Sequence, residues 1–168
     1  KVWTYGYAYA VLTRWQNPGR IEKLYKEIKR GDMLLGHSNG CALIYGAAVL
    51  GAPIRGAVLL NPALDSDKFM PPQVQWVNIY PNHDDVAVKI AKLFPKHPWG
   101  SQGRDGLTVP DARYRTVFTD KDPEHPIHGH SAIISQESRG PWKLRVVADV
   151  LARLEWRWQR KLIEAMET

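Results

Sequence analysis

The sequence predicts an α/β fold with a mostly parallel central sheet of about five strands. Short apolar or alternating runs indicate the strands, at 2–5, 33–35, 55–60, 76–80 and 114–118. Amphipathic or small-residue patterns with helical spacing stand between several of them, at 20–30 and 41–50. Strands that alternate with helices are typical of a parallel sheet joined by crossover helices.

Length and composition favour a single domain over residues 1–168, because 168 residues suffice for one hydrophobic core. Lys and Arg number 23 against 17 Asp and Glu, a net charge of +6 that suits anionic partners without requiring them. The single cysteine, Cys41, excludes an internal disulfide. No apolar run reaches the roughly eighteen residues of a membrane-spanning helix. We expect a cytoplasmic location, since no signal-peptide pattern is visible, and an incomplete N-terminus, since the chain begins at Lys1.

The first elements are read from periodicity and from the residues that interrupt it. Alternating β-formers from Val2 to Tyr5 predict a strand that ends near Gly6. The run 17–19, Asn-Pro-Gly, predicts a break before the helix at 20–30, and Gly31 is expected to end that helix.

The second half of the chain predicts irregular segments around the remaining strands. Residues 65–73, with two prolines, are expected to be irregular, 86–94 to form a short helix and 95–109 a long surface loop. A long helix is predicted from about 141 to 165, with an apolar face for packing on the sheet. Its apolar residues form one stripe at helical spacing: Leu144, Val147, Leu151, Leu154, Trp158 and Leu162.

The stretch 36–40, Gly-His-Ser-Asn-Gly, is the strongest candidate for a functional motif. An apolar strand leads into it and a helix follows, so Ser38 lies at the apex of a sharp turn. Such a turn strains the backbone of the serine, and side chains two residues to either side would collide, which favours glycine at 36 and 40. The simpler alternative is a serine that caps an ordinary helix.

This motif in its strand–turn–helix context resembles the G-x-S-x-G motif of α/β-hydrolases of lipase and esterase type. The resemblance implies a reduced α/β-hydrolase fold, a three-layer α/β/α sandwich, and an enzyme that hydrolyses carboxylic esters through an acyl-enzyme on Ser38. It implies a small-molecule or lipid-like ester substrate and neither metal nor cofactor. Thioesterase or peptidase chemistry with the same triad, and a catalytically silent interaction module, are the alternatives.

The resemblance also implies an order along the chain of serine, acid and histidine. Ser38, Asp84 or Asp85, and His130 follow this order, each a short distance after an apolar strand. Family members often show the acid, one residue and then a valine, which in Asp84-Asp85-Val86 makes Asp84 the acid. Asp85 would then cap the next helix.

The expected base is His130, in a glycine–histidine turn like the one before the family's last helix. His128, two residues upstream, is the alternative. Gly-His-Ser occurs a second time at 129–131, but Ile133 stands where the tight turn would need glycine and no apolar strand precedes it. We therefore interpret Ser131 as a helix-start residue.

The oxyanion hole is expected to use backbone N–H groups of Asn39, at a helix N-terminus, and of Tyr7, in the loop after the first strand. Candidates for substrate contact are His37 and Gly6 near the nucleophile and Trp99 in the 95–109 loop. Phe69 and Met70 are candidates on the other rim of the site.

The C-terminal helix carries a basic and aromatic cluster: Arg153, Trp156, Arg157, Arg160 and Lys161. Such a cluster suits a nucleic acid or an anionic membrane, but basic residues near a helix C-terminus also complement the helix dipole. We expect no nucleic-acid partner and only a weak contact with anionic surfaces. The sequence leaves the oligomeric state open.

Overall fold

The computed structural model describes residues 17–87, 100–135 and 139–166. The predicted strand at 2–5, Gly6, Tyr7, Trp99 and most of the predicted helix at 86–94 lie outside these ranges. The chain divides into two compact units, Lys1–His130 and Ser131–Thr168, which are described in turn. The elements in chain order are α2 (Asn17–Glu27), β1 (Met33–His37), α3 (Asn39–Val49), β2 (Gly56–Leu60), β3 (Trp76–Tyr80), α5 (Gln102–Asp105), β4 (Tyr114–Thr116), the 3₁₀ helices η2 (Thr119–Lys121) and η3 (Ala132–Ile134), and α6 (Arg139–Met166).

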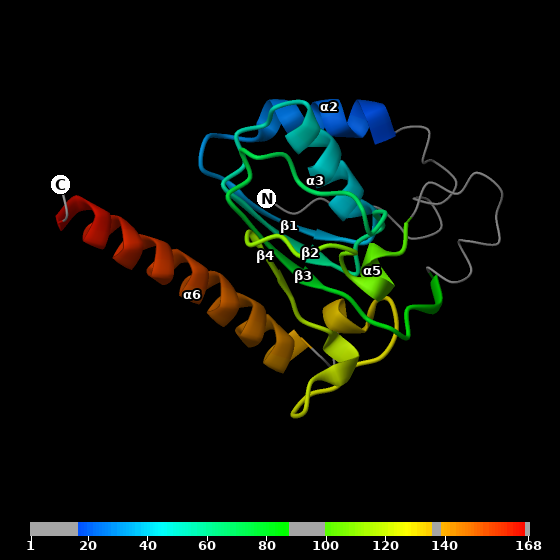
Figure 1. Cartoon of the computed structure of the whole chain (residues 1–168). Coiled ribbons are helices and arrows are strands. Elements are labelled where there is room, and N and C mark those ends of the chain that lie inside the picture. Colours follow the sequence, from blue (N-terminus) through cyan, green and yellow to red (C-terminus); the bar gives the residue numbers. More distant parts are fainter. Residues whose placement is uncertain (1–16, 88–99, 136–138, 167–168) are drawn as a thin grey trace. The chain divides into compact units, whose positions relative to one another are not determined.

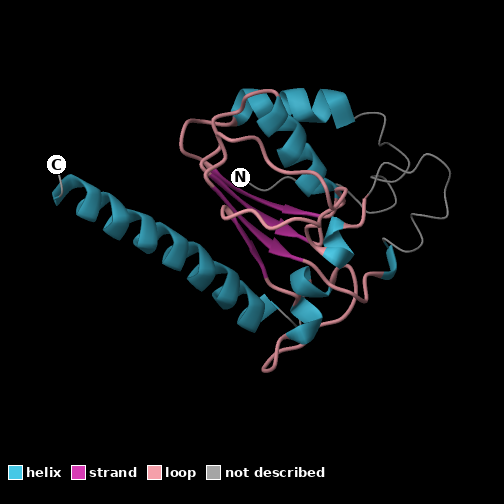
Figure 2. Ribbon diagram, viewed as in Figure 1, coloured by secondary structure: helices cyan, strands magenta, loops and turns pink. Residues whose placement is uncertain are grey.

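Four parallel strands form the sheet of the first unit, in the order β1-β2-β3-β4 (Figure 2). The α/β class and the parallel sheet are thus confirmed, with four strands in the described ranges rather than about five. Every residue of β2 and β3 is buried, which explains why their sequences read as continuous apolar runs.

Helices α2 and α3 lie on the same face of the sheet (Figure 1). The core on this face joins small and apolar residues of α3 to alternate residues of β2 and β3: Cys41, Ile44, Ala47, Ala48, Ala57, Leu59, Val77 and Ile79. A Cβ at Gly46 would stand 2.4 Å from the Cδ1 of Ile21. Glycine at this position therefore allows α2 to pack closely against α3.

Two segments predicted to be irregular contain helical structure instead. Helix α2 begins at Asn17, so 17–19 is its first turn rather than a break, because proline is tolerated where no helical N–H bond is made. The predicted surface loop contains α5, whose Gln102 and Gly103 are buried. Gln102 N–H bonds the carbonyl of Leu64 at 2.9 Å, and a Cβ at Gly103 would stand 2.8 Å from the backbone of Asn61. Small residues here bring two backbones together, so the composition that suggested exposure serves close packing instead.

The second unit consists of η3 and the 28-residue helix α6. Among the described apolar side chains of α6, Trp142 and Val146 are buried, whereas three residues of the predicted stripe are exposed: Leu144 by 71%, Val147 by 47% and Leu151 by 58%. Leu154, in the same stripe, is partly buried. The expectation that this stripe packs on the sheet concerns both units and stays a prediction. In the described ranges, no helix is both long and apolar enough to cross a bilayer.

Candidate active site

The polar residues of interest follow the carboxyl ends of the parallel strands, which lie at one edge of the sheet. Ser38 follows β1 and Asn61 follows β2. The loop 81–85 follows β3, and η2 comes shortly after β4. Parallel strands thus bring together residues that are far apart in the chain, such as His37 and His130, which are separated by 93 positions.

Ser38 has φ 54° and ψ −123°, a backbone conformation that non-glycine residues rarely adopt. A Cβ at Gly36 would stand 2.9 Å from the backbone nitrogen of Cys41, so glycine is required there. Gly40 differs, because a Cβ at that position would meet nothing within 4 Å. The predicted sharp turn is thus present, and the predicted steric need for glycine holds at Gly36 but not at Gly40.

Backbone hydrogen bonds hold Ser38 in this conformation. Its N–H donates to the carbonyl of Leu60 at 3.0 Å, and its own carbonyl accepts from Cys41 N–H at 3.0 Å and from Ala63 N–H at 3.2 Å. Its side chain makes no capping hydrogen bond to α3. Ser38 is therefore held by its backbone, and the helix-cap alternative is not what the structure shows.

Asp85 and His130 form a buried pair. His130 Nδ1 lies 2.6 Å from Asp85 Oδ2, and the two side chains are 10% and 0% exposed. Asn61 donates to the same carboxylate oxygen at 3.4 Å. Because an ionised carboxylate only accepts, His130 donates from Nδ1, and its neutral ring then carries the lone pair on Nε2. In this tautomer the imidazole can accept a proton at Nε2.

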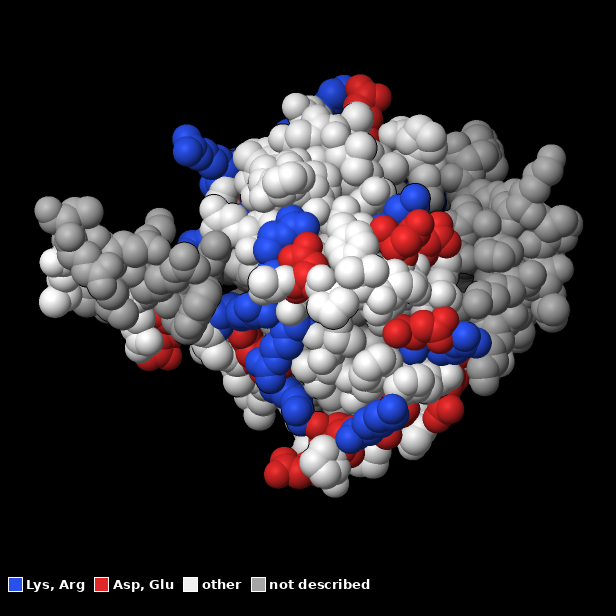
Figure 3. All heavy atoms as spheres, viewed as in Figure 1, with Lys and Arg blue, Asp and Glu red and all other residues white. Residues whose placement is uncertain are grey.

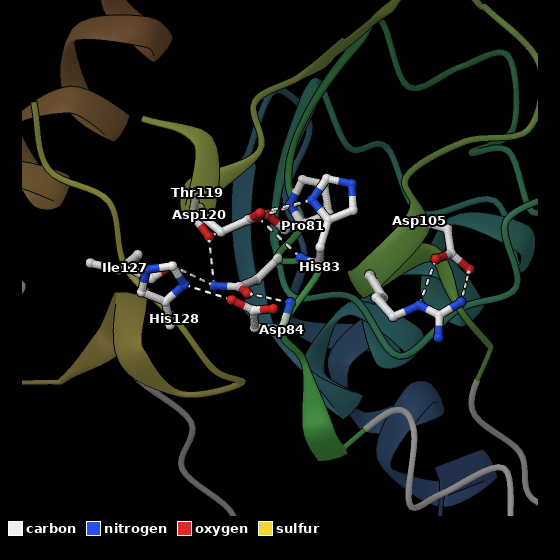
Figure 4. Close-up of polar contacts among 10 residues, drawn as sticks. Pro81, His83, Asp84, Asp105, Thr119, Asp120, Ile127 and His128 are labelled. Carbon is white, nitrogen blue, oxygen red and sulfur yellow. Dashed lines mark hydrogen bonds and ion pairs between the residues drawn. The ribbon is translucent and has the colours of Figure 1, made fainter. Parts of the chain in front are cut away.

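The acid that contacts His130 is Asp85, so the prediction of Asp84 as its partner is wrong. Both residues lie in a turn organised by Asn82, whose side-chain oxygen accepts from Asp84 N–H at 2.9 Å and whose carbonyl accepts from Asp85 N–H at 3.1 Å. This turn directs Asp85 inward and Asp84 outward. Asp84 instead pairs with His128 at 2.6 Å, both side chains being more than half exposed (Figure 4).

His37 connects the serine turn to the His130 loop. Its Nε2 lies 2.9 Å from the carbonyl oxygen of His130, and since a carbonyl only accepts, Nε2–H is the donor. The two rings lie 5.0 Å apart. Burial lowers the pKa of His37 from its ordinary value, although the bond to His130 and the charge of Asp85 oppose this effect. The neutral imidazole of His37, the residue before Ser38, is thus hydrogen-bonded to the backbone of His130.

A third pair, His83 with Asp120, completes this end of the sheet (Figure 4). Asp120 accepts from His83 N–H at 3.0 Å, and its other oxygen lies 2.9 Å from His83 Nδ1. The His83 ring stacks on Phe118, with centroids 4.2 Å apart. Burial alone would raise the pKa of Asp120, but the hydrogen bonds from His83 outweigh it and lower the pKa. This pair joins the loop after β3 to η2.

Two buried asparagines support the site and were not singled out from the sequence. Asn61, with φ 44°, directs its amide to Asp85. The Asn82 amide donates to Thr119 Oγ1 at 3.0 Å and to the Ile127 carbonyl at 2.8 Å, which ties the acid loop to the segment leading to His130. Their position directly after, or one residue after, a buried strand is the signal that could have identified them.

The remaining predicted residues contribute differently. Met70 is buried in the core and Phe69 packs edge-on against Tyr114, so both serve packing. Ser131 is exposed and begins η3. Asn39 is the first residue of α3, and its side chain exchanges hydrogen bonds with Asn17 at 3.0 and 3.2 Å. Gly6, Tyr7 and Trp99 lie outside the described residues.

Two other chemistries would use a cysteine nucleophile or a bound metal ion. Burial strongly raises the pKa of the Cys41 thiol, which donates to the Leu60 carbonyl, so this cysteine is not an activated nucleophile. Among the residues that the structure describes, no three His, Cys, Asp or Glu side chains are arranged to hold a metal ion.

Comparison of the chain with protein-family models, with curated proteins and with solved structures found no match.

Proposed function

We propose that the protein is a serine hydrolase with a reduced α/β-hydrolase fold, which cleaves a small-molecule or lipid-like carboxylic ester. Ser38 is the nucleophile, His130 the general base and Asp85 the acid that orients His130. The observation that carries this proposal is the buried Asp85–His130 pair, together with the hydrogen bond from His37 to the His130 carbonyl. His37 directly precedes Ser38, the serine in the strained turn.

The strained turn supports the role of Ser38. A residue held at positive φ at the end of a strand costs about 1–3 kcal/mol, and such strain concentrates at functional sites. In a nucleophile elbow this conformation exposes the serine hydroxyl at the carboxyl edge of the sheet. Ser38 is at this edge, and its backbone bonds leave its side chain available for chemistry.

The proposed reaction follows from the tautomer of His130. In the first step Ser38 Oγ attacks the ester carbonyl carbon while its proton passes to His130 Nε2. The Asp85 carboxylate stabilises the resulting imidazolium. The tetrahedral intermediate collapses, the C–O bond to the alcohol breaks, and the alcohol leaves with the proton from His130.

Water completes the cycle in the second half. His130 takes a proton from water while the water oxygen attacks the carbonyl carbon of the acyl-enzyme. The second tetrahedral intermediate then expels Ser38 Oγ, which regains its proton from His130, and the carboxylic acid is released. The N–H of Asn39, the residue after the nucleophile at the start of α3, is the proposed oxyanion donor, because the helix dipole favours negative charge there.

Fluorophosphonate labelling followed by mass spectrometry tests the proposal, because the probe phosphonylates only an activated serine. We expect wild-type protein to carry the label on Ser38 and Ser38→Ala to remain unlabelled. Ser131→Ala is the matched control, since Ser131 occupies the second Gly-His-Ser and is exposed. A folded wild-type protein that takes no label, or a label that persists in Ser38→Ala, would refute the assignment.

A further inference from the structure

We propose that helix α6 binds an anionic lipid surface through its exposed apolar stripe. The stripe is defined by Leu144, Val147 and Leu151, which succeed one another at intervals of three and four residues. This spacing places them on one line along a helix. All three side chains are exposed, Leu144 by nearly three quarters.

This stripe is separate from the face that α6 uses for packing. At about 100° per residue, the buried residues Trp142 and Val146 lie roughly opposite the line through Leu144 and Leu151. The helix thus has two apolar faces, one buried and one exposed. Singly exposed apolar residues are ordinary on protein surfaces, but a continuous line of them on a helix indicates a surface for binding.

The charge of α6 identifies the partner. Over Arg139–Met166 the helix carries seven Lys and Arg against three Asp and Glu, a net charge of +4 out of the +6 of the whole chain. On the face shown in Figure 3, by contrast, described cations and anions are interspersed. A helix that combines an exposed apolar line with excess positive charge has the two features by which interfacial helices bind anionic lipid.

Two other partners fit these features less well. A second copy of α6 would meet the stripe with another helix of charge +4, so the charges would repel. A nucleic acid would match the charge, but its phosphates bind cations and make no use of an apolar line. An anionic bilayer accommodates both features, because the apolar residues enter the acyl boundary while the cations remain among the headgroups.

The test is cosedimentation of the full chain with two kinds of vesicle. The chain carries Ser38→Ala, so that the proposed ester hydrolysis cannot degrade the lipid during the measurement. We expect binding to mixed phosphatidylcholine–phosphatidylserine vesicles, weaker binding as salt is added, and little binding to pure phosphatidylcholine. The double variant Leu144→Ser/Leu151→Ser should bind the mixed vesicles at least about a hundredfold more weakly, since each leucine contributes about tenfold or more. The double variant Leu50→Ser/Val109→Ser removes apolar residues of similar exposure elsewhere and should bind like the parent.

A charge reversal provides a second, independent arm. Lys143→Glu, at an exposed position of α6, should weaken binding about tenfold, whereas Lys68→Glu, exposed in the first unit, should leave it unchanged. Circular dichroism checks that each variant is folded. Equal binding to both vesicles, no binding, or binding that survives the α6 substitutions would overturn the proposal. Two further results, in a protein that does not bind vesicles, would also overturn it. One is binding to duplex DNA, and the other is a wild-type dimer that becomes monomeric in the double variant Leu144→Ser/Leu151→Ser.

Because binding is measured without turnover, this inference is independent of the proposed catalytic function. Vesicle binding by a protein that takes no fluorophosphonate label would support the role of α6 and refute the hydrolase assignment. Labelling without vesicle binding would do the reverse.

Discussion

Replacing Asp85 by Asn is the substitution that most directly tests the proposed site. Asn has the same shape as Asp and keeps an oxygen that can accept from Asn61 and from His130, but it removes the negative charge beside the imidazole. It can also turn an N–H toward His130 Nδ1. His130 would then carry its proton on Nε2, where it cannot accept one from Ser38.

The magnitude follows from the burial and contact of the two side chains. Charges about 4 Å apart at an effective dielectric constant of about 20 attract by roughly 4 kcal/mol, and this attraction develops only as His130 gains its proton. Since about 1.4 kcal/mol corresponds to a tenfold change in rate, losing it slows the reaction by about 10³-fold. The unfavourable tautomer extends the expected loss toward 10⁴-fold.

Asp84→Asn is the matched control, because it makes the same chemical change one residue away. Asp84 and His128 also lie 2.6 Å apart, but both side chains are more than half exposed. Solvent screens such a pair, so its removal is expected to change rates by less than about threefold.

The assay is the rate of fluorophosphonate labelling of Ser38 in the wild type and the two variants, with urea denaturation to confirm that each is folded. We expect Asp85→Asn to be labelled at least about a thousandfold more slowly and Asp84→Asn at nearly the wild-type rate. Slow labelling of Asp84→Asn beside normal labelling of Asp85→Asn would return the acid role to Asp84. Normal labelling of both would show that neither carboxylate assists Ser38.

Two further predictions concern the residues on either side of Ser38. Gly36→Ala should lower the free energy of unfolding by about 2–3 kcal/mol, because its Cβ would overlap backbone atoms of Gly40 and Cys41. Gly40→Ala should instead raise the free energy of unfolding slightly, by about 0.5 kcal/mol, since alanine favours a helix and its Cβ would meet nothing there. Urea denaturation measures both, and effects of the same sign would contradict the steric argument. His37→Gln tests the pKa of His37, which faces His130 and Asp85. Because that pKa is lowered in the folded state, the unfolded chain binds more protons in acid than the folded chain does. The stability contributed by neutral His37 is therefore present above about pH 6.5 and is lost as the pH falls. The stability difference between wild type and His37→Gln should therefore shift against the wild type below about pH 6.5, and a difference that does not change with pH would refute it.

Local patterns predicted the order of the elements and the serine turn well. The runs at 55–60 and 76–80 are fully apolar or nearly so because both faces of their strands are buried, and only a central parallel strand has that requirement. The turn at Ser38 could be predicted because its chemistry is local. A strand, a glycine required by close backbone contact and a helix start all lie within a few residues of it.

The choice between Asp84 and Asp85 could not be made from local patterns. Both carboxylates are adjacent, and both His128 and His130 were available as partners. What separates the pairs is the direction in which each side chain leaves the turn, and that depends on the tertiary contacts of Asn82 with Thr119 and Ile127. Likewise, periodicity identified the apolar stripe of α6 but could not show that Trp142 and Val146 would be the buried side.

In the part of the chain that the structure describes, three pairs of aspartate and histidine side chains lie near the carboxyl end of this sheet, and burial distinguishes them more clearly than distance does. The pairs of His128 and His130 have the same 2.6 Å separation, yet the first is open to solvent and the second is almost fully enclosed. The exposure of the His83–Asp120 pair is intermediate. Asp120 also accepts a hydrogen bond from the backbone N–H of His83, and its carboxylate therefore organises a loop. A carboxylate stabilises an imidazolium strongly only where water does not screen it. Of the three, His130 alone combines an enclosed carboxylate with a hydrogen bond to the residue next to Ser38, and this combination, rather than its sequence motif, is the strongest argument that His130 is the base.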